Sequence, residues 1–292
     1  MPRADGETRR EPVRLAFTRL KGPAGVTRCP LVVLHGLFGS RSNWRTLGRR
    51  LAQHRDVYLL DAVNHGLSPR AETMGYREQS ADLLAFLEAE RLPQPVLIGH
   101  SMGGKTAMLG ALRAPDRVAG LVVVDIAPVP YPATGNGAGA HADLIGAMKR
   151  LPLRTLTSRR MADRTLAGTV EDPSLRAFLL HSLVRAPDGS FEWQLNLRVL
   201  TSALPELRDF PLDELEPTHG GARFEGTTLF LLGGSSEYVR PNGRSTARAL
   251  FPRAHFEVIP GAGHWLHAER PEETYARVAR ALEAVYAGTD GQ

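Results

Sequence analysis

The stretch PVLIGHSMGG at residues 95–104 decides the expected fold of this chain. It begins with a short apolar run that is typical of a buried strand, and residues 102–113 continue with the pattern of a helix that ends before Pro115. Between the two, residues 99–103 match the pattern Gly-x-Ser-x-Gly. A strand, this turn and a helix in succession predict a nucleophile elbow, which lifts the Ser101 hydroxyl above the edge of a parallel sheet.

The two glycines of this pattern have a steric role. A turn this sharp strains its central residue and brings neighbouring turns of the chain together, and glycine removes the side chains that would clash there. The helix that follows points backbone N–H groups at any anion that forms beside the serine. A glycine-rich turn without chemistry is the alternative interpretation.

Apolar strands alternate with helical patterns on both sides of this motif, which is typical of a parallel sheet with crossover helices. We expect strands at residues 13–20, 30–36, 56–62, 95–99, 118–126, 227–233 and 256–259. We expect helices at residues 43–54, 80–91, 102–113, 246–251 and 272–286. The predicted fold class is α/β, with a mostly parallel sheet flanked by helices.

The alternation stops at about Pro128, where a segment rich in Pro, Gly and Ala begins. After it, helices are expected at residues 142–151, 158–166, 173–184 and 199–207, with an extended stretch at 190–195. We therefore expect a mainly helical cap, residues 133–222, inserted after the strand that ends at Asp125. The core would comprise residues 13–132 and 223–288, and residues 1–12 would form a disordered lead.

The composition is that of an ordinary globular protein. The 292 residues are 42% hydrophobic and 23% charged, and a chain of this length buries a core without disulfides or metals. The single cysteine, Cys29, excludes an internal disulfide framework and a metal site built from cysteines, and it favours a cytoplasmic location. The chain has no run of 18 apolar residues and no apolar stretch behind its first charges, so neither a transmembrane helix nor a signal peptide is expected.

The net charge of +5 raises the question of a nucleic-acid or membrane partner. The 36 basic residues are scattered along the chain, whereas a nucleic-acid site gathers them into a stripe that follows the phosphates. We therefore expect no nucleic acid and no membrane as partners. The expected partner is a small molecule, and the chain is expected to be a monomer or a homodimer.

A serine nucleophile needs a base, because a neutral hydroxyl reacts poorly at pH 7. In the elbow architecture the chain order is serine, acid, histidine, which leaves His255, His264 and His267 as candidates. His264 lies in a glycine-rich loop after a strand, at the edge where ligands gather in open α/β sheets. His255 begins that strand at the opposite edge, and His267 lies in the turn before the last helix. We predict that His264 is the base.

Two carboxylates compete for the role of the acid that orients the histidine. Asp125 ends a nearly all-apolar strand, where an unpaired charge is costly to bury, so it requires a partner. Glu237 follows the strand at 227–233, which is the more usual place for the acid in this architecture. We favour Asp125 and keep Glu237 as the alternative.

The segment HGLFG at residues 35–39 follows a buried strand and supplies the remaining part of the site. An oxyanion hole needs the N–H of the residue after the nucleophile and a second N–H from this loop, which predicts Met102 and Leu37 as backbone donors. Phe38 and Trp265 are candidates for an apolar substrate pocket, with core packing as the alternative. For His35 and His100 we expect a structural role in bracing the loops.

Five stretches together resemble the α/β-hydrolase superfamily, and more narrowly the small YbfF-like esterases. They are LVVLHGLFGSRSNW (31–44), NHGLSP (64–69), GHSMGGKTAM (99–108), VVDIAPVPY (123–131) and GAGHWLHAERPE (261–272). The resemblance covers residues 30–132 and 227–285, and it implies an α/β-hydrolase fold with Asp125 as the acid. It departs at Val63, where relatives commonly have arginine, so a salt bridge from that position is not implied.

Taken together, these residues predict acyl transfer to water through an acyl-enzyme. Ser101 would attack a carbonyl while His264 takes its proton and Asp125 orients His264. The expected substrate is an ester or thioester with a short to medium acyl chain, and no metal or organic cofactor is expected. Two alternatives remain open: the same triad acting on C–C bonds, lactones or peracids, and a non-enzymatic ligand-binding protein on the same fold.

Overall fold

The computed structural model describes residues 10–25, 28–134, 140–212, 222–239 and 241–289. Its centre is a seven-stranded sheet in the order β1-β3-β2-β4-β5-β8-β9, in which β1 is antiparallel to β3 and the other neighbours are parallel. The strands are β1 Phe17–Leu20, β2 Leu31–Leu34, β3 Val57–Leu60, β4 Val96–His100, β5 Gly120–Val124, β8 Thr227–Gly233 and β9 Ala254–Ile259. The predicted fold class, a mostly parallel sheet flanked by helices, is confirmed.

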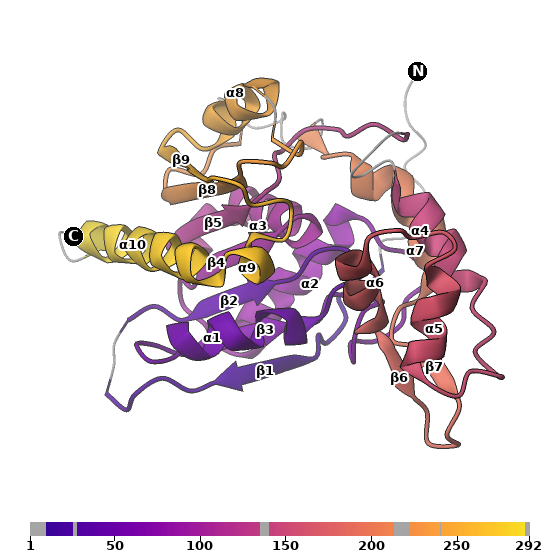
Figure 1. Ribbon diagram of the computed structural model, residues 1–292. Coiled ribbons are helices and arrows are strands. Elements are labelled where there is room, and N and C mark those ends of the chain that lie inside the picture. Colours follow the sequence, from indigo (N-terminus) through magenta and orange to yellow (C-terminus); the bar gives the residue numbers. More distant parts are fainter. Residues whose placement is uncertain (1–9, 26–27, 135–139, 213–221, 240, 290–292) are drawn as a thin grey trace.

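Helices cover both faces of this sheet (Figure 1). They are α1 Arg45–Leu51, α2 Tyr76–Ala89, α3 Met102–Arg113, α8 Pro241–Leu250, α9 Leu266–Glu269 and α10 Pro271–Thr289, with short 3₁₀ helices at Arg41–Trp44 and Pro115–Arg117. Along β2, Leu31 and Val33 pack with residues of α1 and α10, whereas Val32 and Leu34 pack with residues of α2 and α3. Because both faces are covered, β2 is apolar at every position.

A second group of elements lies between β5 and β8, and Figure 1 places it at one side of the sheet. It contains α4 His141–Lys149, α5 Arg159–Leu166, α6 Pro173–Leu180, β6 Leu183–Arg185, β7 Phe191–Trp193 and α7 Leu197–Arg208. This segment is the predicted cap, and we use that name for it. The proposed limits of the cap stay predictions, because residues 135–139 and 213–221 lie outside the described residues.

The cap contains a hairpin that the sequence analysis missed in part. The helix expected at 173–184 ends at Leu180, and Leu183–Arg185 instead forms β6, which pairs antiparallel with β7. The connection spans residues 186–190, in which the Gly189 N–H donates to the carbonyl of Ala186 at 2.9 Å and Gly189 has φ +85°. An Asp-Gly pair between extended residues is a strong hairpin signal, so the turn could have been recognised from the sequence.

The predicted disordered lead needs a correction at its end. Residues 1–9 lie outside the described residues, but Arg10 forms a salt bridge of 2.7 Å with the buried carboxylate of Asp82. Asp82 also accepts a hydrogen bond from the backbone N–H of Val13 at 2.8 Å. A buried carboxylate requires such partners, and they fix the chain against the core from Arg10 onwards.

Helix α10 packs on the sheet through Val278, Leu282 and Val285, and it begins at Pro271, a residue type that favours the first position of a helix. At 19 residues it is the longest helix in the described part of the chain. None of the helices within the described ranges has the length and apolar character needed to cross a membrane.

Candidate active site

The predicted site residues converge because parallel strands end at one edge of the sheet. The segments that follow β2, β4, β5, β8 and β9 carry, in that order, the HGLFG turn, Ser101, Asp125, the loop around Glu237 and His264. His255 lies near the beginning of β9, at the other edge, and pairs with Leu229 of β8. His264 and His255 therefore lie at opposite ends of β9, and only His264 lies at the edge that carries Ser101.

Ser101 occupies the strained turn that its motif predicts. Its backbone lies at φ 52° and ψ −119°, a region that residues with a side chain rarely adopt. Two hydrogen bonds hold it there: the Ser101 N–H donates to the carbonyl of Val124 at 3.0 Å, and the Lys105 N–H donates to the carbonyl of Ser101 at 3.1 Å. Ser101 is buried but for 7% of its surface.

The glycines of the elbow are required by close backbone contacts. A Cβ atom at Gly99 would lie 2.3 Å from the carbonyl oxygen of Gly103, and one at Gly103 would lie 2.5 Å from that of Leu34. These neighbours are backbone atoms inside the sheet and the helix, so they have little room to move. The two glycines therefore set the close packing of β4, α3 and β2.

The structure pairs His264 with Asp125. The Nδ1 atom of His264 lies 2.8 Å from Oδ2 of Asp125, which is fully buried. Because an ionised carboxylate only accepts hydrogen bonds, Nδ1 carries the proton and Nε2 is left as a proton acceptor. The Gly233 N–H donates to Oδ1 of Asp125 at 2.9 Å, and the Ser236 hydroxyl donates to Oδ2. Asp125 thus has hydrogen-bond partners that offset its burial.

Glu237, the alternative acid, is exposed, and its two neighbours contact the Asp–His pair instead. Ser236 donates to Asp125, and the ring of Tyr238 stacks on the ring of His264 with centroids 3.8 Å apart and planes at 14°. The sequence analysis missed both residues. A serine and a tyrosine in a loop carry no signal of their own, and the loop brings them to the pair only after β8 has packed beside β5.

The HGLFG segment forms a tight turn beside Ser101. The Gly39 N–H donates to the carbonyl of Gly36 at 3.0 Å, and Phe38 has φ +65° at the third position of the turn. The Phe38 N–H donates to Nε2 of His65 at 3.3 Å, so the Leu37 N–H lies outside both of these hydrogen bonds. A Cβ atom at Gly36 would lie 3.2 Å from Cβ of Ser101, which shows how closely the turn approaches Ser101.

Met102, the other predicted donor, is the first residue of α3. The first N–H groups of a helix have no acceptor within the helix, and they carry the positive end of its dipole. The Met102 N–H therefore belongs to the set of donors that an anion at Ser101 would meet.

Three further histidines brace the loops, as expected for His35 and His100. The Ala62 N–H donates to Nε2 of His35 at 3.0 Å, and Nε2 of His100 lies 2.9 Å from the carbonyl oxygen of His264. His267 stacks on Trp44 with ring centroids 4.5 Å apart. Burial lowers the pKa of all three rings, to about 3 for His267, so they stay neutral near pH 7.

The two candidate pocket residues both contact the cap. Phe38 is 2% exposed and meets His141 of α4 edge-on, with ring centroids 5.6 Å apart. Trp265 is half-buried between His264, at 5.6 Å, and Phe178 of α6, at 5.5 Å. The cap therefore reaches the segments on both sides of Ser101.

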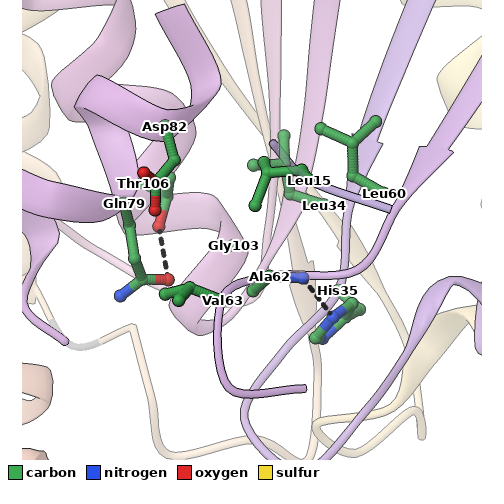
Figure 2. Close-up of a pocket in the computed structure, with 10 residues that line it drawn as sticks. All are labelled: Leu15, Leu34, His35, Leu60, Ala62, Val63, Gln79, Asp82, Gly103 and Thr106. Atoms are coloured by element: carbon green, nitrogen blue, oxygen red, sulfur yellow. Dashed lines mark hydrogen bonds between the residues drawn. The ribbon is translucent and has the colours of Figure 1, made fainter. Parts of the chain in front are cut away.

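A small cavity lies between the sheet and helices α2 and α3, and Figure 2 shows the residues that line it. Ser101 and His264 are not among them; the lining includes Val63, Gln79, Asp82 and Thr106, whose hydroxyl donates to Oε1 of Gln79. Its volume of about 10 Å³ is room for about one water molecule, which is too small for an acyl group. Val63, the position that departs from the YbfF-like pattern, contributes an apolar side chain here.

Comparisons with known proteins identify the family of the chain. A family model described as alpha/beta hydrolase fold matches residues 30–271. The sn-1-specific diacylglycerol lipase ABHD11 of Mus musculus is 42% identical over 269 residues, which are 90% of this chain and 83% of that protein. Esterase YbfF of Escherichia coli (strain K12) is 36% identical over 253 residues, 87% of this chain and 92% of that protein. Among solved structures, a marine microorganism esterase has a TM-score of 0.85 at 34% identity and covers 92% of this chain and 99% of its own.

The chain therefore belongs to the α/β-hydrolase fold family. Within that family it is an enzyme of the carboxylic ester hydrolase class, as its lipase and esterase relatives are. The predicted resemblance to YbfF-like esterases is confirmed, and the alternative of a non-enzymatic binding protein is dropped.

Proposed function

We propose that Ser101, His264 and Asp125 form a catalytic triad that hydrolyses carboxylic esters or thioesters with short to medium acyl chains. One observation carries this proposal: the hydrogen bond of 2.8 Å between Nδ1 of His264 and Oδ2 of Asp125, two residues that lie 139 positions apart. The bond fixes the tautomer that a base needs, at the same sheet edge as the strained turn of Ser101.

The reaction follows from these groups. Nε2 of His264 takes the proton of the Ser101 hydroxyl as its oxygen bonds to the carbonyl carbon, and the carbonyl electron pair moves onto the oxygen. The N–H groups of Leu37 and Met102 stabilise that oxyanion. The bond to the leaving alcohol or thiol then breaks, and His264 returns the proton to it. Water adds to the acyl-enzyme by the same route, and Ser101 regains its proton as the acid leaves.

Asp125 stabilises the imidazolium that exists between these proton transfers. Its hydrogen bonds from Gly233 and Ser236 keep the carboxylate oriented toward His264 while it stays buried. Since the neighbouring base generates the nucleophile, the proposed reaction uses no metal and no organic cofactor.

The proposed substrate has an apolar acyl part, which Phe38 and Trp265 would contact. A diacylglycerol is a carboxylic ester too, and the 42% identity to a diacylglycerol lipase makes it a second candidate substrate. We propose a cytoplasmic setting for the reaction, which the unpaired Cys29 supports. A panel of p-nitrophenyl esters, acyl thioesters and 1,2-diacylglycerols of increasing chain length would rank these substrates.

The nucleophile is tested with Ser101→Ala. We expect kcat on p-nitrophenyl butyrate to fall by roughly 10⁶-fold, and labelling by a fluorophosphonate probe to disappear. A Ser101→Ala protein that keeps most of its hydrolytic activity would exclude the proposed triad.

The acid is tested with a matched pair of carboxylate substitutions. Asp125→Asn should lower kcat by roughly 10⁴-fold, because the amide would hold the wrong tautomer of His264. Glu237→Gln, in an exposed position on the neighbouring loop, should leave kcat unchanged. If Glu237→Gln is the impaired variant and Asp125→Asn is not, the assignment of the acid is wrong.

A further inference from the structure

Phe38, in the middle of the oxyanion turn, is held from both sides by side chains of distant residues. Its N–H donates to Nε2 of His65 at 3.3 Å, and its carbonyl oxygen accepts a hydrogen bond of 2.9 Å from the hydroxyl of Ser182. Both hydrogen bonds are buried. Ser182 belongs to the cap, where it lies between α6 and β6.

The turn needs such support because Phe38 has φ +65°. A left-handed conformation is unfavourable for a residue with a side chain, and it persists only where the surroundings favour it. The peptide unit before Phe38 carries the Phe38 N–H that His65 binds, and the Leu37 N–H lies one peptide unit earlier. The contacts of Phe38 therefore hold the peptide unit next to the one that carries the Leu37 N–H.

The His65 side of this support is fixed in one tautomer. Nδ1 of His65 lies 3.0 Å from the carbonyl oxygen of Val63 and donates to it, which leaves Nε2 as the acceptor for Phe38. Burial lowers the pKa of His65 to about 3, so the acceptor remains unprotonated at neutral pH.

The cap also holds the segment that contains His65. His65 forms a β-bridge with Leu195, and the Asn196 N–H donates to the carbonyl of Asn64 at 3.0 Å. The Asn196 side chain donates to Oδ1 of Asn64 at 2.9 Å. Ser182 lies directly before the β6–β7 hairpin, and Leu195 and Asn196 follow it. Both supports of Phe38 are therefore attached to this hairpin of the cap.

The Ser182 side is equally fixed. The Gln194 N–H donates to the carbonyl of Ser182 at 2.8 Å, and the Ser182 N–H donates to the carbonyl of Leu179 at 3.1 Å. The residue is 5% exposed, and its hydroxyl is directed at Phe38 by the hairpin and by the end of α6. A shift of the hairpin relative to the core would therefore move the Ser182 hydroxyl and break its hydrogen bond with the Phe38 carbonyl.

We propose that the cap positions the oxyanion hole, with Ser182 and His65 as the positioning residues that hold the Leu37 N–H toward Ser101. This inference rests on the proposed function, because it assigns a scaffold to the oxyanion donor of that reaction. Neither residue touches the reacting atoms: each acts through the backbone of Phe38.

The expected kinetic effect is on kcat and not on KM. The negative charge develops on the carbonyl oxygen only in the transition state, so a misdirected donor weakens transition-state binding more than substrate binding. Loss of an entire donor lowers kcat by roughly 10²–10³-fold. Ser182→Ala leaves the donor in place and the His65 contact intact, so we expect a loss of roughly 10-fold.

The test compares Ser182→Ala with Tyr76→Phe. The Tyr76 hydroxyl donates to the carbonyl of Leu207 at 2.7 Å, so this control also removes one buried hydrogen bond between core and cap, away from the oxyanion turn. We measure kcat and KM for p-nitrophenyl butyrate and Ki for an alkyl trifluoromethyl ketone, whose adduct with serine carries an oxyanion. Ser182→Ala should lower kcat and raise Ki by a similar factor at unchanged KM, whereas Tyr76→Phe should change none of the three.

Ser182→Thr keeps the hydroxyl and so controls for effects of substituting Ser182 other than loss of the hydrogen bond. It should recover most of kcat. The inference is overturned if Ser182→Ala keeps wild-type kcat and Ki, if its loss appears in KM alone, or if Tyr76→Phe loses as much kcat as Ser182→Ala. Failure of the proposed triad would instead appear in Ser101→Ala, in a protein whose Ser182 is unchanged.

Discussion

Two strained residues flank the site, and they are held in different ways. Ser101, at φ 52°, is held by the backbone of its own sheet: Val124 on the next strand accepts its N–H, and Gly99 and Gly103 let the turn close. Phe38, at φ 65°, is held by side chains that lie 27 and 144 residues away, and the second belongs to the cap. One strained turn depends on backbone contacts within the core, and the other depends on side-chain contacts, one of which comes from the cap.

This difference assigns the turn of Ser101 to the core and the support of the Phe38 turn in part to the cap. The turn of Ser101, the proposed nucleophile, is formed by a strand and a helix of the core, so its conformation should survive changes in the cap. The proposed oxyanion turn contacts the cap directly through Ser182, and it contacts it indirectly through His65, which forms a β-bridge with Leu195 of the cap. Substitutions in the two regions should therefore separate loss of stability from loss of catalysis.

The largest expected loss of stability comes from a substitution in the nucleophile elbow. In Gly103→Ala the new Cβ would lie 2.5 Å from the carbonyl oxygen of Leu34 and 2.6 Å from that of His35, both backbone atoms. Overpacking at such a site should lower the free energy of unfolding by about 3 kcal/mol, measured by urea denaturation. In Gly39→Ala, the matched change in the oxyanion turn, the Cβ would meet its nearest atoms at 3.0 Å, and we expect a clearly smaller loss. Equal losses in the two variants would contradict the comparison.

A smaller difference in stability, between glycine and alanine variants of the same residue, measures the backbone strain in each turn. Glycine tolerates positive φ, so Ser101→Gly should be more stable than Ser101→Ala by about 2 kcal/mol, despite the greater flexibility of glycine in the unfolded chain. The same pair at Phe38, where the backbone is in the ordinary left-handed region, should differ by about 1 kcal/mol. Urea denaturation of the four variants checks this order. A glycine variant that is less stable than its alanine counterpart at either position would show that the turn there is not strained.

The part of the site that follows from local pattern could be predicted from the sequence. Helix α3 spans residues 102–113 and strand β8 spans residues 227–233, both as expected, because apolar runs and the elbow glycines mark them locally. The same local pattern led to Ser101 and to the loop of His264. The β6–β7 hairpin was missed because the helical pattern of 173–184 was extended past its real end at Leu180.

The contacts that depend on distant packing could not be predicted. Ser236, Tyr238 and Ser182 are ordinary loop residues in the sequence, and only the folded chain brings them to Asp125, His264 and Phe38. The choice between Asp125 and Glu237 was likewise open from strand position alone. In the folded chain the loop after β8 directs the Ser236 hydroxyl at Asp125, whereas the Glu237 side chain is exposed.

The smallest expected effect concerns a contact that joins the elbow helix to the cap. Lys105 of α3 is 1% exposed, and its ammonium donates to the carbonyls of Val129 at 2.9 Å, Arg208 at 3.0 Å and Asp209 at 2.7 Å. Helix α7 ends at Arg208, so the ammonium also meets the negative end of a helix dipole. Helix α3 is therefore joined to the same cap that contacts Phe38, but through a group that titrates.

Burial lowers the pKa of Lys105 from 10.5 to about 7, although the charge of Asp209 opposes the shift. Between pH 7 and about 10 the unfolded chain then binds more protons at this residue than the folded chain does, so stability rises with pH across that window and the gain is lost as pH falls through 7. From pH 7 to pH 8 the contribution is about 1 kcal/mol. Urea denaturation at both pH values should show this increment in the wild-type protein and not in Lys105→Met, whose side chain does not titrate. The same pH dependence in both proteins would mean that Lys105 is charged in the folded state throughout, and that the junction between elbow helix and cap does not respond to pH.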